Sequence, residues 1–287
     1  MEPDVPPPEH PATEEPAKAE LGKPGPQHVE FALDRIAETA RVGFARAAVF
    51  TGLGCNAALR PDVIEYHLDH ATRFRVLPET VPAEMMKEWK GELYNWTVAS
   101  GLRDIVDFTN RFLEQLYEAL SIATLHRRDA KALKRFDKGG LKDKIASLEA
   151  EFGIHCRYPD TLVSIGAVRN CLVHRLGIVG PQDLDASGQL TLSWFGFVLQ
   201  IKGEGGLEIP GPSLAGPSGG PEMPIPVSPG DEIQARFQVF SEQFALGKKV
   251  VITPHVLHQV LWSVQQMTNE YVTEVTKWAR AKGILRE

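Results

Sequence analysis

The sequence is short of cysteine and of long apolar runs. Its 287 residues include only Cys55, Cys156 and Cys171. An odd number of cysteines at unrelated spacings favours reduced thiols over a disulfide framework or a zinc site. No run of about 18 consecutive apolar residues occurs, and the first residues lack the positive charge and apolar stretch of a secretory signal. These shortages predict a cytoplasmic protein that contacts no membrane and carries no metal or cofactor.

Large apolar side chains are also scarce at the start of the chain, where proline is abundant. Eight prolines fall within residues 1–26. Such a segment buries too little apolar surface to offset the entropy that ordering costs. We therefore expect residues 1–29 to form a disordered tail rich in proline and glutamate.

Net positive charge is lacking as well, since the formal charge at pH 7 is -6. Residues 1–30 hold seven acids and two lysines, so the remaining chain is nearly neutral. Within it, residues 126–144 contain eight Lys or Arg against three Asp, a local excess that attracts phosphates. The candidates for RNA binding are Arg127, Arg128, Lys131, Lys134 and Arg135. A solvated helix and turn with ordinary surface lysines explains the same pattern.

Apolar residues at offsets of three and four, the period of an amphipathic helix, are plentiful. The period predicts helices at residues 31–50, 62–74, 82–125, 141–153, 160–177 and 254–285. The glycines in 51–54 are expected to stop the first helix. The third is either one long helix or two helices that meet near residue 100. Thr253 is expected to cap the last helix, with Pro254 in its first turn.

Beyond residue 180 the composition turns to β-branched and aromatic residues. Runs at 189–203, 232–240 and 248–254 are predicted strands. The Gly/Pro-rich stretch 203–232 is too long for a tight turn, so it is predicted to be an exposed loop.

These elements together predict a mainly α fold: a helical bundle with a small antiparallel β insertion before the C-terminal helix. We expect residues 30–81 to form an N-terminal helical segment. Residues 82–287 are expected to form one helical domain.

The helix predicted at 160–177 carries a charged residue within its apolar face. That face is formed by Leu162, Ile165, Val168, Leu172, Val173 and Leu176. Arg169 lies inside it, where burial is costly unless an acid, a phosphate or backbone carbonyls meet the guanidinium. Asn170 and His174, one turn apart, lie together on the flank and are able to touch. Arg169 and His174 are about 140° apart around the axis, so a shared site needs a bent arginine or a second copy of the helix.

A family resemblance rests on these residues. The segment VRNCLVHRLGIV, residues 168–179, resembles the signature of HEPN domains, a helical family. In that signature an Arg, usually followed by a polar residue, precedes a His near the end of a helix. Here Asn170 follows Arg169, four positions separate Arg169 from His174, and Gly177 closes the helix.

The resemblance extends beyond the motif, over roughly residues 80–280. The long upstream helix and GKKVVITPHVLHQVL, residues 247–261, also look like this family. Arg175 and Leu176 depart from the polar residues that are common after the histidine.

Many HEPN proteins are metal-independent endoribonucleases that work as dimers, with two motif helices facing each other across a cleft. The resemblance implies that His174 transfers the proton of an RNA 2′-hydroxyl, while Arg169 holds the phosphate and Asn170 orients it. It also implies a homodimer and, for members that act as toxins or defence effectors, an antitoxin or regulatory protein as partner. The alternative is a non-catalytic HEPN-like module that binds RNA or nucleotides, or that assembles subunits through Arg169 and His174.

Two histidine pairs have a simpler explanation than metal binding. His67 with His70, and His255 with His258, each lack further ligands at a suitable spacing. We expect surface or helix-start histidines at all four positions.

Other polar groups and the tryptophans are also assigned structural roles. Asp104, Asp107 and Asn110 are expected on solvated helix surface, although an acid there is the most natural in-chain partner for Arg169. The glycines of TGLGCN, residues 51–56, lack the lysine and the strand–helix context of a phosphate loop. The five tryptophans are expected in the core.

Overall fold

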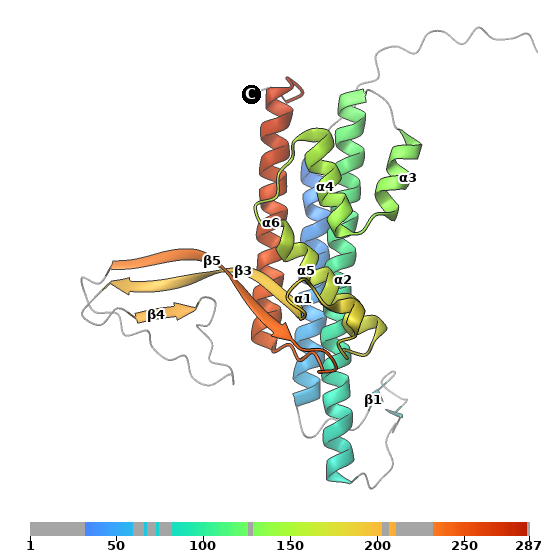
Figure 1. Ribbon diagram of the computed structural model, residues 1–287, viewed down its shortest axis with the longest axis vertical. Helices are drawn as coiled ribbons and strands as arrows, with labels where there is room; N and C mark the ends of the chain where they lie inside the picture. Colours follow the sequence, from blue (N-terminus) through green and yellow to red (C-terminus); the bar gives the residue numbers. More distant parts are fainter. Residues whose placement is uncertain are drawn as a thin grey trace, which may run out of the picture. The chain divides into compact units, whose positions relative to one another are not determined.

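The computed structural model is mainly helical, which confirms the coarse fold class. It describes residues 32–59, 66–67, 73–74, 82–125, 129–202, 207–210 and 232–285. Its α-helices are α1 Leu33–Leu59, α2 Ala83–Leu125, α3 Ala130–Lys138, α4 Leu141–Phe152, α5 Pro159–His174 and α6 Pro254–Ala281. Helices α1, α2 and α6 pack against one another (Figure 1). The predicted tail and most of the predicted loop lie outside the described residues.

Helix α1 continues through the glycines that were expected to stop it, so the predicted end was wrong. Of the two, Gly54 allows α1 and α2 to approach closely, as does Gly43 earlier in α1, whereas Gly52 has nothing within 4 Å of an added Cβ. A Cβ atom on Gly54 would lie 2.5 Å from Thr97 Cγ2, and one on Gly43 would lie 2.1 Å from Phe108 Cγ. Gly101 of α2 meets α1 in the same way, since a Cβ there would lie 2.2 Å from Thr51 Oγ1. Close packing therefore offsets the poor helix propensity of glycine.

Among the described helices, α1 is the one that is long and apolar enough to cross a membrane, by length and composition. Core helices of water-soluble proteins pass the same criterion. Ala40, Phe44 and Ala47 are buried, whereas Val49 and Phe50 are exposed.

Helix α2 is one continuous helix of 43 residues. Of the two alternatives predicted for residues 82–125, the single long helix is therefore correct. Pro82 comes directly before its first residue, a place where proline is tolerated. Its predicted apolar stripe is buried, including Leu102, Ile105, Leu113, Leu116 and Leu120.

The short helix predicted at 62–74 is wrong where the structure describes it. Tyr66–His67 and Arg73–Phe74 are short antiparallel strands, β1 and β2, with Tyr66 opposite Phe74. Tyrosine and phenylalanine favour strands, and a helix this short is marginal without packing.

The later helices lie close to their predicted ranges. Gly153 ends α4 in the left-handed conformation, with φ of 69°, as expected of a residue past a helix end. Thr253 caps α6 by accepting a hydrogen bond from the Val256 amide at 3.2 Å. Helix α5 ends at His174, three residues before the predicted end at Gly177.

The sheet has a long central strand. Strand β3, Leu190–Lys202, pairs antiparallel with β4, Leu207–Pro210, and with β5, Glu232–Phe244. Strand β4 lies within the stretch predicted to be a loop. The strand predicted at 248–254 is wrong: of it, Lys249 alone makes a bridge, to Ile178, and α6 begins at Pro254.

Strand β3 is attached to two helices through its backbone. The Ser193 amide donates to Ser164 Oγ of α5, and the Phe195 amide donates to Ser263 Oγ of α6, both at 2.9 Å. These serines satisfy amide groups of β3 that point away from β5. The sheet therefore holds α5 against α6.

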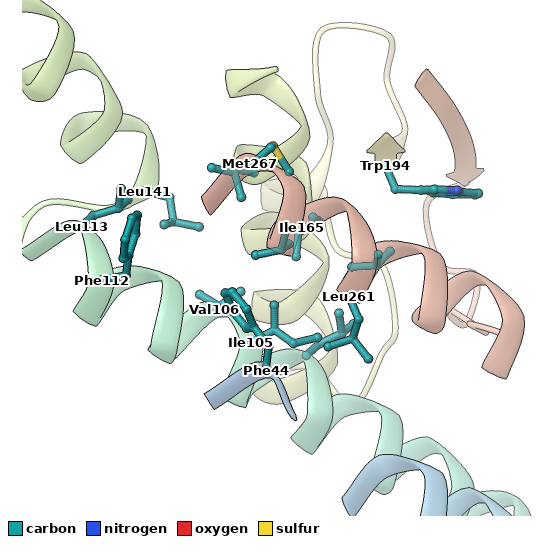
Figure 2. Packing of buried hydrophobic residues seen from close by; sticks show 14 of the residues in the cluster. Phe44, Ile105, Val106, Phe112, Leu113, Leu141, Ile165, Trp194, Leu261 and Met267 are labelled. Atoms are coloured by element: carbon teal, nitrogen blue, oxygen red, sulfur yellow. The ribbon is translucent and has the colours of Figure 1, made fainter. Parts of the chain in front are cut away.

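The core is shared by helices far apart in the sequence. Figure 2 shows Phe44 of α1 and Ile105 of α2 close to Ile165 of α5 and Leu261 of α6. The buried side of α5 is thus fixed by its neighbours, and the orientation of its other side chains follows.

Candidate functional site

The buried face of α5 contains Arg169, as its sequence position predicted. Leu162, Ile165 and Val168 are almost fully buried, and the Arg169 side chain is only 19% exposed. A guanidinium held among apolar side chains needs partners for its five N–H groups.

Arg169 finds two of these partners close by. Its Nη2 donates to Asp107 Oδ1 of α2 at 3.2 Å, and its Nη1 donates to Asn170 Oδ1 at 3.0 Å. Its Nε is buried and has no partner among the described residues. The acid of α2 expected to meet Arg169 is therefore Asp107, which is itself 55% exposed.

The other two polar residues considered on α2, Asp104 and Asn110, interact with other cations. Asp104 lies 3.7 Å from Arg46 Nε and 3.9 Å from Arg103 Nη2. Asn110 accepts a hydrogen bond from Lys144 Nζ at 3.0 Å. Neither of them joins the Arg169 cluster.

His174 is the last residue of α5 and is exposed. Within the described chain it makes no hydrogen bond or ion pair, and Asn170 is bonded to Arg169 instead of to His174. The structure therefore brings Arg169 and Asn170 together but leaves His174 apart. One copy of the chain does not assemble all three into one site.

The turn after His174 has an unusual backbone. Leu176 has φ of 53° and Gly177 has φ of 77°, so a leucine occupies the left-handed region. This conformation costs a residue with a Cβ about 1–2 kcal/mol. Leu176 was expected in the buried face, but it is 84% exposed, because the helix ends before it.

A buried ion pair holds the chain that follows. Arg175 Nε donates to Asp183 Oδ2 at 2.6 Å, and Gly180 N donates to the same oxygen at 2.9 Å. Nearby, burial raises the pKa of Cys171 to about 11. Cys171 is therefore protonated at neutral pH and is no nucleophile.

A cavity of about 330 Å³ lies between α2 and the end of α5. Its walls include Trp96, Ser100 and Arg103 of α2, Val173 and Leu176 of the α5 end, and Lys249. Positions 96, 100, 103 and 107 of α2 follow one another at offsets of three and four, and in α5 position 173 follows 169 at an offset of four. The cavity therefore runs along the same helix faces as the Arg169–Asp107 pair.

The sequence did not predict that Trp96, Arg103 and Leu176 line this cavity. Trp96 was expected in the core, yet it is 68% exposed. Its place about 140° from the centre of the apolar stripe of α2 was the available signal. The role of Leu176 as a cavity wall depends on the turn after α5, which has no comparable signal.

The basic residues predicted to bind RNA are only partly described. Lys131, Lys134 and Arg135 are exposed on α3, whereas Arg127 and Arg128 lie outside the described residues. Arg135 Nη2 lies 3.7 Å from Glu151 Oε1.

Lys144, which contributed to the positive excess, does not add to an accessible patch. It is 3% exposed, and its Nζ donates to Glu114 Oε1 at 2.6 Å. Its charge therefore serves an internal ion pair.

Helix α3 lies some distance from Arg169. Phe136 of α3 stacks on Tyr117 of α2 with ring centroids 4.0 Å apart. Tyr117 follows Asp107 by ten residues, about 15 Å along the helix. The basic surface of α3 is thus separate from the Arg169 cluster.

The histidine pair at the start of α6 is part of a structural network. His255 Nε2 lies 3.0 Å from Gln259 Nε2, and burial lowers the pKa of His255, with a smaller effect from His258. His70 and the His67 side chain lie outside what the structure describes. In the described part of the chain, no three His, Cys, Asp or Glu side chains are grouped to hold a metal ion.

The chain matches no protein-family model, no curated protein and no solved structure.

Proposed function

We propose that this chain is a metal-independent endoribonuclease of HEPN type, whose active sites are shared by two copies. The observation that carries the proposal is the state of Arg169. Its guanidinium is mostly buried, one of its nitrogens lacks a described partner, and its acidic partner Asp107 is half exposed. An incoming phosphate displaces that carboxylate and gains the bidentate geometry that arginine offers.

The chemistry uses the 2′-hydroxyl of RNA as the nucleophile. His174 accepts its proton, the 2′ oxygen bonds to phosphorus, and the bond from phosphorus to the 5′ oxygen breaks. Arg169 stabilises the negative charge that develops on the phosphate, and a proton passes to the leaving 5′ oxygen. The products are a 2′,3′-cyclic phosphate and a 5′-hydroxyl.

Two copies are required because Arg169 faces α2 while His174 is exposed at the end of α5. A two-fold axis near the end of α5 places His174 of one copy beside Arg169 of the other. Each dimer then holds two equivalent sites.

The competing function is a non-catalytic assembly module. It is favoured by the exposed apolar side chains Trp96, Leu176 and Ile178, which suit a subunit contact. In that case the Arg169–Asp107 pair is only structural.

Incubation of RNA with wild type and with His174→Ala, both with excess chelator, separates these functions. If the chain is a nuclease, wild type yields RNA with cyclic phosphate ends, and the cleavage rate of His174→Ala is lower by about a hundredfold or more. His155→Ala, at another exposed histidine, is the matched control and retains activity. Equal degradation by wild type and His174→Ala, or none by either, contradicts the nuclease.

A further inference from the structure

We infer that the cavity between α2 and α5 binds one unpaired nucleotide of an RNA chain, with its base stacked on Trp96. This inference rests on the proposed function, because it identifies where the RNA next to the cleaved phosphate is held. The cavity of about 330 Å³ falls in the size range of small-ligand pockets.

Trp96 provides the stacking surface. Its side chain is 68% exposed at the wall of the cavity, although tryptophan is a residue that folding normally buries. Bases of single-stranded RNA stack on exposed aromatic rings regardless of sequence. An exposed indole beside a cavity is the arrangement that such binding needs.

Leu176 forms another part of the wall, in a strained backbone conformation. Its φ of 53° is unfavourable, and its 84% exposure means that burial gives no compensation. Strain of this kind is concentrated at binding and catalytic sites. The strained turn holds an apolar side chain in the wall of the cavity, where it contacts a bound base.

The polar residues of the cavity suit a nucleotide better than an apolar partner. Ser100 and Asn95 supply groups that hydrogen-bond to base edges. Arg103 is half exposed, and its ion-pair partner among the described residues is Asp104, at 3.9 Å. Lys249 adds a second cation, paired with Glu92 at 2.8 Å. The charged residues of the wall are two cations and one acid, so the lining attracts a phosphate.

The cavity is also placed correctly relative to Arg169. Val173 lines the cavity and follows Arg169 by one helical turn, about 6 Å along the axis. Once released from Asp107, the arginine side chain is long enough to span that distance. A nucleotide in the cavity therefore places its phosphate within reach of the Arg169 guanidinium.

The test measures RNA binding without cleavage, in the His174→Ala protein. A labelled single-stranded oligonucleotide is titrated before and after the change Trp96→Ala. We expect the Kd to rise about tenfold, and Trp96→Phe to restore most of the affinity. Trp89→Ala is the matched control, since Trp89 lies on the same helix, is 38% exposed and does not line the cavity. It changes the Kd less than about twofold.

A second variant tests the contribution of Leu176 to the cavity wall. Leu176→Asn relieves the left-handed strain, because asparagine tolerates that region. We expect it to raise the melting temperature and to weaken single-strand binding.

Binding of duplex RNA, whose bases are already stacked, is unchanged by Trp96→Ala.

These outcomes separate the inference from the function on which it rests. If wild type cleaves RNA but Trp96→Ala leaves the Kd unchanged, the proposed nucleotide site is ruled out and the proposed nuclease activity stands. If single-strand binding depends on Trp96 but wild type does not cleave RNA, the nuclease activity is ruled out and the nucleotide site stands. If Trp96→Ala converts dimers to monomers in sedimentation, the cavity is a subunit contact and the inference is overturned.

Discussion

At the scale of single residues, Asp107 decides how available Arg169 is. Its carboxylate lies 3.2 Å from the guanidinium and occupies a nitrogen that the proposed phosphate contact needs. Removing that negative charge therefore favours the phosphate. We expect Asp107→Asn to lower the Kd for RNA about threefold or more.

The matched control is Asp160→Asn, at an exposed aspartate in the first turn of α5 that does not line the cavity. It leaves the affinity nearly unchanged. Fluorescence anisotropy at constant salt measures both variants in the His174→Ala background. If Asp107→Asn binds RNA more weakly than the His174→Ala protein alone, the ion pair instead holds the Arg169 guanidinium in position for the phosphate.

His255 makes part of the fold sensitive to pH. Trp194 Nε1 donates to Gln259 Oε1 at 2.6 Å, so the Gln259 amide nitrogen faces His255 Nε2 as a donor. That contact requires an unprotonated Nε2, and burial lowers the pKa of His255 from its ordinary value of 6.5. Because the folded pKa lies below the unfolded one, this stabilisation is complete above pH 6.5 and is lost as the pH falls through the folded pKa.

Urea unfolding at pH 7.5 and at pH 5 measures this effect. We expect His255→Gln to lose less stability between these two pH values than wild type does. His155→Gln, at an exposed histidine, keeps the pH dependence of wild type. An identical pH dependence for wild type and His255→Gln contradicts the assignment.

At the scale of elements, glycines set the distance between α1 and α2. Gly101→Ala places a Cβ atom 2.2 Å from Thr51 Oγ1, so the helices must separate or Thr51 must move. Overpacking outweighs the gain in helix propensity, and we expect the free energy of unfolding to fall by about 1–2 kcal/mol. Gly52→Ala is the control, because nothing lies within 4 Å of its added Cβ.

Gly52→Ala raises the free energy of unfolding by about 0.5–1 kcal/mol through helix propensity. Denaturation in urea compares the two variants directly. If Gly101→Ala is as stable as wild type, the close approach of α1 and α2 is not required.

These glycines also explain which elements the sequence could predict. Helices α4 and α6 were predictable because periodicity and capping residues agree, at Gly153 and Thr253. Periodicity alone predicted α5, so its end was placed three residues too late. The end of α1 was not, since a sequence shows a glycine but not the side chain that lies opposite it. The run 248–254 has strand composition. Among the described residues it pairs only briefly, with the segment 177–179, before it leads into the N-cap of α6.

The candidate site was predictable to the same degree. The period of α5 placed Arg169 in a buried face, and the polar residues of α2 supplied Asp107 as its partner. The cavity was beyond sequence reasoning, because its walls come from two helices and a turn. Leu176 in particular depends on a left-handed backbone that leucine rarely adopts.

At the scale of the whole molecule, the central question is how residues that point apart in one chain act together. Arg169 is bonded to α2, and His174 is exposed at the end of α5. Within one copy, the geometry supplies an anion-binding group without a proton-transfer group beside it. In the proposed dimer, two copies supply both at each site.

Mixing two inactive variants tests this account most directly. Arg169→Ala keeps His174, and His174→Ala keeps Arg169, so a heterodimer of the two contains one intact shared site. At equal amounts half of the dimers are mixed, and we predict that RNA cleavage recovers to about a quarter of the wild-type rate. A mixture that stays as inactive as either variant alone, after subunit exchange is verified, contradicts the shared site.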